Sequence, residues 1–214
     1  MEIAAGLILS LIGISGLFAA GKHFAGNSYL AMQLRYQPTT LAMALGLYGI
    51  SWWISGRDPV LAPGDVSAIA TEVSWLGYPT NSTWASIGPQ FALIAFLVTT
   101  VVVYLQVLKG KSRAGLATAI ALALPLSVAN ALTEEIIFRA IPIQSLWPAT
   151  AAVTVALVSA VLFGIPHYFG TPGKVPGVLM AGFLGYVAAL SVMDTHGLVA
   201  AWLIHFVQDV PIIA

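Results

Sequence analysis

The stretch AGLATAIALALPLSVANALTEEIIFRAI, residues 114–141, decides how this chain must fold. Its apolar run is long enough to cross the hydrocarbon core of a bilayer, which takes roughly 20 residues of helix. Two adjacent carboxylates, Glu134 and Glu135, and the guanidinium of Arg139 interrupt it. A charge at the bilayer centre costs about 2.5 kcal/mol or more. These three side chains therefore need a specific reason to be there.

The rest of the chain is equally apolar. Of its 214 residues, 59% are hydrophobic and 7% are charged, and the mean hydropathy is +0.92. A soluble domain is about a quarter charged, so lipid must cover most of this protein's surface. Zero net charge and the lack of a basic patch exclude nucleic-acid binding, and the lack of cysteine excludes disulfides, thiolate metal sites and a cysteine nucleophile.

Seven apolar segments predict an all-α fold, a polytopic transmembrane helix bundle that forms one domain over residues 1–214. The first segment lacks the basic start of a signal peptide, so we interpret it as a retained span. The predicted spans are 3–21, 39–55, 87–108, 114–141, 148–168, 176–193 and 198–213.

Loop charges predict the orientation of the bundle, because cytoplasmic loops are enriched in lysine and arginine. One set of alternate loops holds only cations: Lys22, Arg35, Lys109, Lys111, Arg113 and Lys174. The opposite set has Arg57 as its only cation and holds Glu2, Asp58, Asp65, Glu72 and Asp194. We therefore predict that the N-terminus lies outside and the C-terminus in the cytoplasm.

The long connection over residues 56–86 lies on the predicted outer side. Val66, Ile69, Val73 and Leu76 fall at helical spacing within it, and Asp65 is placed to cap a helix start. The pattern predicts a short amphipathic helix in the membrane interface. A packed loop is the alternative.

Polar side chains inside the predicted spans form pairs at helical spacing. Residues four apart share a helix face, and three such pairs occur: Glu135 with Arg139, Phe163 with His167, and His205 with Asp209. Glu134 points about 100° away from Glu135 and is left for another role. Three helices can thus bring a carboxylate and two imidazoles to one pocket, which is the equipment for activating water and holding an oxyanion.

Each of these residues also has a purely structural interpretation. An intramembrane histidine can be a satisfied packing residue, a Glu–Arg pair can staple a bundle, and Asp209 can lie at the wet interface. We predict that His23 is a surface residue and that His196 is an ordinary loop residue. The combination of three ordered pairs, each in its own span, favours a catalytic pocket.

Three short motifs carry a resemblance to a known family. EEIIFR (134–139), FGIPH (163–167) and HFVQD (205–209) resemble the motifs of the CAAX protease and bacteriocin-processing family, also called the ABI family, which includes the type II CAAX prenyl endopeptidases. The resemblance covers a core of about residues 87–213. Residues 1–86, two accessory spans and an outer amphipathic segment, carry no motif.

Two positions depart from the family pattern. Ala140 stands where the family usually has glycine after the arginine. Asp209 stands where the prenyl endopeptidases have asparagine, which weakens the case for a prenylated CAAX substrate.

The resemblance implies a glutamic-type intramembrane endopeptidase that needs no cofactor. It assigns Glu134 as the general base, His167 as its helper, and His205 and Asp209 as the groups that stabilise the oxyanion. Because an ionised Asp209 is a poor donor, we interpret it as a residue that orients and charges His205. The supporting residues are Glu135, Arg139 and Phe163.

The resemblance also bears on the partner and the location. A membrane-associated peptide or protein is the expected substrate: a C-terminal sorting signal, a leader peptide or a lipidated C-terminus. A prokaryotic plasma membrane is the expected location of this integral membrane protein.

Other functions stay open from the sequence alone. Glu134, His167 and His205 could instead ligate zinc for a metal-dependent version of the same reaction, although no H-E-x-x-H pattern is present. A polar cluster in a bundle could also relay protons in a transporter, but we see no internal repeat. A non-catalytic scaffold or an immunity protein is the remaining alternative.

Overall fold

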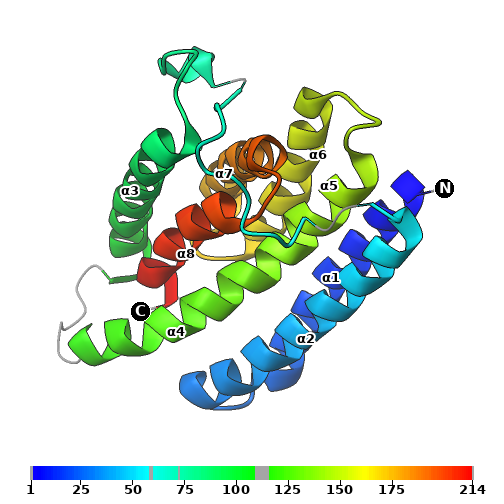
Figure 1. The fold of residues 1–214 in the computed structure, drawn as a ribbon. Helices are drawn as coiled ribbons and strands as arrows, with labels where there is room; N and C mark the ends of the chain where they lie inside the picture. The colour runs from blue at the N-terminus through cyan, green and yellow to red at the C-terminus, as the bar shows by residue number, and fades with distance from the viewer. Residues whose placement is uncertain (1, 58–59, 72, 109–115, 214) are drawn as a thin grey trace.

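The computed structural model describes residues 2–57, 60–71, 73–108 and 116–213, and these form an all-α bundle (Figure 1). Its α-helices are α1 (Glu2–Phe24), α2 (Tyr29–Ser55), α3 (Trp84–Val103), α4 (Leu116–Glu135), α5 (Ile141–Leu146), α6 (Ala152–Gly164), α7 (Lys174–Thr195) and α8 (Val199–Ile213). Short π or 3₁₀ segments extend or connect them: η1 (Ser74–Leu76), η2 (Tyr104–Leu108), η3 (Ile136–Ala140) and η4 (Ile165–Phe169).

The predicted all-α class and the seven predicted helices are confirmed, because α4, η3 and α5 run on as one helix. Five of the helices in the described residues are long and apolar enough to cross a membrane: Glu2–Phe24, Trp84–Gln106, Ala117–Leu146, Ala152–Phe169 and Lys174–Thr195. The other two are α2, which is long but carries polar residues in its first half, and α8, which has only 15 residues.

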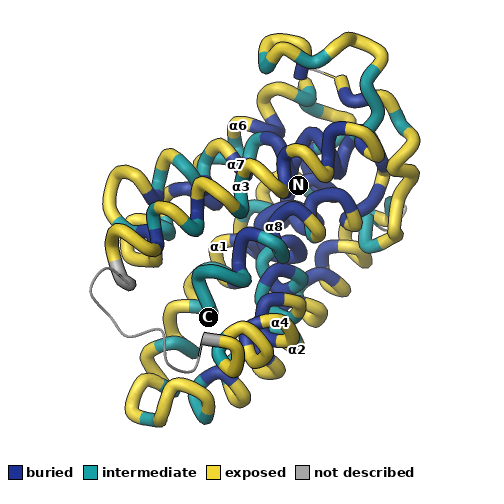
Figure 2. Tube along the Cα trace, turned by 90° about the vertical axis from the view of Figure 1, so that its left-hand side faces the viewer, coloured by how far each residue is buried: buried dark blue, intermediate teal, exposed yellow. Residues whose placement is uncertain are grey.

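The helices pack around α4 and α8. The α1–α2 hairpin lies along one side of α4 and α5, while α8 lies between α4 and α3, and α6 packs on α7 (Figure 1). Buried positions concentrate where these helices meet, and the outward faces of α1 and α3 are largely exposed (Figure 2). Many large apolar side chains are exposed, Trp53 and Phe169 among them, whereas Glu135 and Arg139 are fully buried. This distribution is typical of a protein whose solvent is lipid.

The helix that carries EEIIFR does not end where the sequence predicted. The predicted span ends at residue 141, yet the helix continues through Pro142 to Leu146. The π segment just before it explains the difference, because the amide of Ile141 donates to the carbonyl of Ile136, five residues earlier. This wider turn lets the chain pass a proline, which has no N–H to donate.

The predicted start of the second span, residue 39, was also wrong. Helix α2 begins at Tyr29, so Arg35 lies on the helix rather than in a loop, and Pro38 lies within it. Gln37 donates to Gln33 one turn earlier over 3.0 Å. Because these two polar side chains satisfy each other in part, they do not end the helix.

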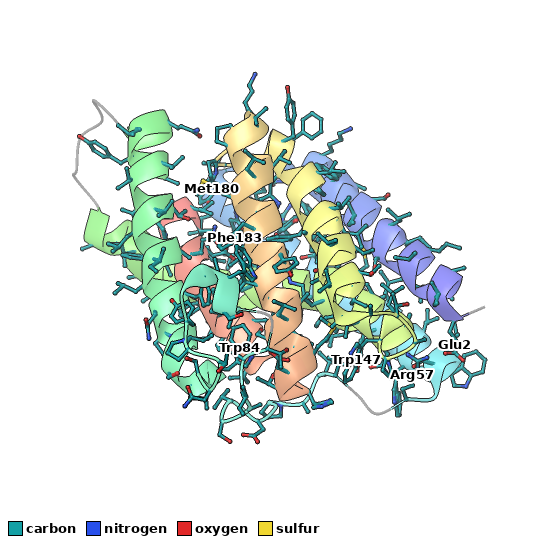
Figure 3. All side chains as sticks on the ribbon, turned by 90° about the horizontal axis from the view of Figure 1, so that it is seen from above. Glu2, Arg57, Trp84, Trp147, Met180 and Phe183 are labelled. Atoms are coloured by element: carbon teal, nitrogen blue, oxygen red, sulfur yellow. The ribbon has the colours of Figure 1, made fainter. Side chains whose placement is uncertain are left out.

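The charges of the predicted outer loops gather at one end of the bundle. Glu2 pairs with Arg57 over 3.1 Å, and Arg57 also donates to the carbonyl of Trp147. Glu2, Arg57, Trp147 and Trp84 lie along the same side of the view in Figure 3. Which end faces the cytoplasm stays a prediction. Five of the predicted loop charges lie outside the described residues: Asp58, Glu72, Lys109, Lys111 and Arg113.

The predicted amphipathic helix in residues 56–86 is wrong, and the packed loop is correct: the described part holds only the 3₁₀ turn η1. Asp65 caps no helix, because its carboxylate accepts hydrogen bonds from the hydroxyl and amide of Ser67, which lower the pKa of Asp65. Asp194 at the end of α7 accepts from the amide of Thr71 and from the indole of Trp84, each over 2.9 Å. These contacts hold the loop across the ends of α3 and α7.

The turn between α7 and α8 must also come very close to this loop. A Cβ on Gly197 would lie 2.3 Å from the amide nitrogen of Gly64 and 2.5 Å from the carbonyl oxygen of Ala62. Both atoms belong to the backbone and cannot move aside alone. Glycine at 197 is therefore a packing requirement.

We expect Gly197→Ala to lower the free energy of unfolding by about 1–3 kcal/mol, the usual cost of overpacking. The matched control is Gly26→Ala in the α1–α2 connection, where a Cβ would meet no atom within 4 Å. Thermal unfolding of the purified protein in one detergent measures both. Equal melting temperatures for the two variants would contradict the close approach.

Candidate active site

The seven predicted site residues lie together. Helix α4 carries Glu134 and Glu135, and α8 carries His205 and Asp209. The π segment carries Arg139, while Phe163 and His167 lie where α6 passes into η4. A continuous series of contacts connects all seven, and the predicted convergence of three segments is thus confirmed.

Glu135 and Arg139 form the predicted ion pair. Nε of Arg139 donates to one carboxylate oxygen over 2.8 Å and a terminal nitrogen donates to the other over 2.5 Å. Neither side chain is exposed at all. The guanidinium carbon lies 4.0 Å from the centroid of the Phe163 ring, so the cation is also placed on an aromatic face. The π segment between them is fully buried.

His205 is oriented by a residue that the sequence reasoning did not assign to it. Its Nδ1 donates to Glu135 over 2.7 Å, so the buried ion pair holds the ring. Its Nε2 lies 3.7 Å from Glu134 and 3.5 Å from the predicted partner Asp209. Each ring nitrogen thus meets a carboxylate, an arrangement that favours N–H on both nitrogens.

Glu134 faces away from Arg139, as its helical position predicted. Its side chain is 15% exposed, whereas that of Glu135 is fully buried. One oxygen of Glu134 accepts a hydrogen bond from the amide of Asn130 over 3.1 Å. The same amide nitrogen donates to Asp209 over 3.0 Å, so Asn130 bridges the two carboxylates. Asp209 is 5% exposed, which rules out the wet-interface interpretation.

Asn130 is the site residue that the sequence reasoning missed. The signal was present, because an asparagine within an apolar span and four residues before Glu134 lies on the same helix face. Its contact with α8 could not be read from that spacing.

His167 has a defined tautomer in this arrangement. Its Nδ1 donates to the backbone carbonyl of Phe163 over 2.7 Å, which leaves Nε2 as the basic nitrogen. The ring also packs on the Phe163 ring, with centroids 4.5 Å apart. Phe163 contacts the His205 ring as well, at 5.2 Å between centroids, and so spaces the two imidazoles.

Glu134 and His167 line one cavity of about 630 Å³. The other walls come largely from the α1–α2 hairpin, including Phe18, Met32 and Tyr36. Lys22 and Ala25 also line it and are exposed, so the cavity reaches the surface at that end of the bundle. A carboxylate and an imidazole thus meet in a mostly apolar space of the size that binds small ligands.

A second, much smaller pocket adjoins the site. It has a volume of about 20 Å³, room for roughly one water molecule. His167, His205 and Asp209 line it together with Phe163. His167 therefore lines both the large cavity and this small pocket.

Glu134, His167 and His205, the residues of the zinc alternative, lie near one another but do not form a metal-binding arrangement. Within the described ranges, no group of three or more His, Asp or Glu side chains is arranged to hold a metal ion. Nδ1 of His205 and Nδ1 of His167 are both engaged in hydrogen bonds, so only Nε2 of each ring could serve as a ligand. The other two histidines, His23 and His196, lie away from the site, exposed or packed on Trp147.

One comparison with known proteins gives the family. Residues 116–210 match the family model described as type II CAAX prenyl endopeptidase Rce1-like. This stretch, less than half of the chain, is similar to that family. That family is one of glutamic-type intramembrane proteases. A search of curated proteins and a search of solved structures gave no match.

The matched residues contain all three motifs and the helices that carry them. The match begins at Leu116, whereas we expected the family core to begin near residue 87. Helices α1, α2 and α3 lie outside it, although α1 and α2 form much of the cavity wall.

We expect Arg139→Met to destabilise the protein by about 3–5 kcal/mol, because it leaves Glu135 buried without its cation. The double variant Glu135→Gln/Arg139→Met removes both charges and should recover most of that loss. Unfolding in detergent measures each. Glu2→Gln is the control, since it breaks the exposed pair with Arg57 and should cost no more than about 1 kcal/mol. A double variant as unstable as Arg139→Met would contradict the assignment.

Proposed function

We propose that this protein is an intramembrane endopeptidase in which Glu134 activates water against a peptide bond in a membrane-associated substrate. The observation that carries the proposal is the shared cavity: the Glu134 carboxylate and the His167 ring line it, and its other walls are mostly apolar. Such a space accepts an extended apolar peptide and places its backbone beside a base.

The hydrolytic step follows from the roles of the two groups. Glu134 takes a proton from water while the water oxygen attacks the carbonyl carbon, and Nε2 of His167 accepts the second hydrogen bond of that water. The tetrahedral intermediate then breaks its C–N bond. The proton held by Glu134 passes to the leaving nitrogen, so the enzyme returns to its starting state.

The oxyanion of the intermediate needs a donor, and His205 is the best placed. Its ring is held by Glu135 at Nδ1, so Nε2 points toward the region between Glu134 and Asp209. An N–H at this position donates to the developing negative charge. Asp209, with Nε2 at 3.5 Å, favours the protonated ring that this role requires.

The shape of the cavity supports a substrate that approaches from the Lys22 end. Under the predicted orientation this end is the cytoplasmic one, so the substrate would enter from the cytoplasmic leaflet. A lipidated C-terminus, a leader peptide and a C-terminal sorting signal all fit an apolar cavity of about 630 Å³. The family description concerns prenyl substrates, while Asp209 departs from the asparagine of that group.

Glu134→Gln should abolish cleavage and leave the fold intact, because it keeps the shape of the side chain and removes only the base. His167→Ala and His205→Ala should each remove nearly all turnover, because the first removes the group that helps to activate water and the second removes the donor to the oxyanion. The protein is reconstituted in liposomes and assayed with a panel of quenched-fluorescence peptides, with and without an isoprenyl group on cysteine. Melting temperature in detergent controls for folding, and near-normal turnover by Glu134→Gln would refute the assignment.

The same liposomes separate the metal-dependent version from the proposed one. Activity should survive exhaustive chelation if Glu134 and His167 activate water themselves. Loss of activity with chelator and its recovery with stoichiometric zinc would instead support a zinc enzyme. Inhibition by added zinc alone is expected in either case, since a Glu/His pocket binds zinc readily.

Asp209→Asn should lower turnover by about 10- to 100-fold, the usual effect of losing a hydrogen-bonded supporting partner. Asp209 accepts from Asn130 and faces His205, and an amide offers one acceptor atom in place of two. The variant is measured in the liposome assay beside Gln90→Glu, a change on the exposed face of α3. Turnover equal to or above wild type would show instead that residue 209 donates directly to the oxyanion.

A further inference from the structure

Buried amide side chains connect helix α2 to the two carboxylates of the site. Gln37 uses one amide nitrogen to donate to Gln33 over 3.0 Å and to Asn130 over 3.4 Å. Asn130 then donates to Glu134 over 3.1 Å and to Asp209 over 3.0 Å. The bond between Gln37 and Gln33 stays within α2. The other three bonds all run from the Gln37 amide through Asn130 toward the carboxylates of α4 and α8.

We propose that Asn130 is a positioning residue for the Glu134 base, and that Gln37 sets the orientation of the Asn130 amide. This inference rests on the proposed function, since it assigns how the base is held. It also gives the α1–α2 hairpin, which lies outside the family match, a part in the catalytic centre.

The first argument is electrostatic. Glu134 and Asp209 lie near one another, and Arg139 is already paired with Glu135. The Asn130 amide supplies one hydrogen to each carboxylate, so it holds both at hydrogen-bond distance without adding a charge. Without it, His205 alone would stand between two carboxylates, and Glu134 would lose the bond that fixes its direction.

The second argument concerns the direction of the amide. An asparagine side chain can turn over and exchange its oxygen and nitrogen. If it did so here, its oxygen would face the two carboxylates and repel them. Gln37 prevents this, because its donor requires the Asn130 oxygen on the α2 side.

The third argument is the burial of Gln37. It is 4% exposed, and its own carbonyl oxygen has no partner. A buried unpaired polar atom costs about 1–3 kcal/mol, and a leucine would fill the same position without that cost. Packing therefore does not explain a glutamine at this position, whereas orientation of Asn130 does.

Gln33 extends the series to the substrate side. It is 9% exposed, accepts from Gln37 and lines the cavity that Glu134 and His167 also line. Gln33, Gln37 and Asn130 thus connect the wall of the cavity to the general base, Glu134.

Kinetics test the positioning role in liposomes. Gln37→Leu and Asn130→Leu should each lower kcat by about 10- to 100-fold with little change in KM, as expected for a base that is misdirected rather than a lost binding contact. The double variant should be no slower than Asn130→Leu, because Gln37 acts through Asn130. Thr40→Val is the control, since this buried hydroxyl bonds only to carbonyls of α2 and should leave kcat unchanged. Additive losses, or wild-type kcat in Gln37→Leu, would overturn the proposal.

A second measurement does not depend on activity. The chain has three asparagines, Asn27, Asn81 and Asn130. Selective ¹⁵N labelling of asparagine therefore gives three side-chain NH₂ groups by NMR in micelles. The Asn130 group should exchange with solvent far more slowly than the other two, and exchange should speed up in Gln37→Leu but not in Thr40→Val.

The kinetic and NMR measurements distinguish failure of the proposed protease function from failure of the positioning role of Asn130 and Gln37. A wild-type protein that cleaves no peptide of the panel counts against the proposed function, while the NMR result still decides the amide series. Fast exchange of the Asn130 group in wild type, or the same rate in Gln37→Leu, overturns the inference even if the protein is an active protease.

Discussion

The site depends on one buried carboxylate, that of Glu135. It accepts two hydrogen bonds from Arg139 and one from His205. The side chains of Glu135 and Arg139 are fully buried, and that of His205 is 3% exposed. In a low-dielectric interior an unpaired charge is costly, so the three side chains hold one another in place. The pair orders the π segment of the helix, and the bond to Nδ1 fixes the ring on α8. Glu135, a supporting residue of the motif, thus orients His205, the histidine that we propose as the oxyanion donor.

The adjacency of Glu134 and Glu135 has a structural reason. Neighbouring residues on a helix differ by about 100°, so one carboxylate can be buried in an ion pair while the other faces a cavity. Glu135 is fully buried and Glu134 is 15% exposed. The first supports the scaffold, and the second is left with one amide donor and a space where a reacting group fits. Consecutive positions on one helix thus supply a buried carboxylate for the ion pair and a partly exposed carboxylate for the cavity.

The membrane decides how the remaining polar groups are used. Lipid offers no hydrogen bonds, so polar side chains gather inside, as with the buried Glu135 and Arg139, and apolar ones such as Trp53 and Phe169 face outward. Polar contacts in the interior therefore also connect the site to helices that carry none of the three motifs. Helix α2 reaches the site through Gln37 and Asn130, and the α1–α2 hairpin encloses the cavity. The matched region alone would leave Glu134 without this wall.

The sequence by itself determined the all-α fold, the seven helices and most of the polar side chains that the structure brings together. These follow from local properties: apolar length sets a span, and spacing of four sets a shared helix face, as for Glu135 and Arg139. It failed at the start of α2 and at Pro142, where the Gln33–Gln37 pair and a π turn let the helix continue. It also failed in residues 56–86, where contacts with distant residues such as Asp194 hold a loop. Only the tertiary structure decided that Glu135 holds His205, that Asn130 bridges Glu134 and Asp209, and that α1 and α2 enclose the cavity. The hydrogen bonds among these contacts join residues up to 79 positions apart, and no periodicity along the chain encodes such a distance.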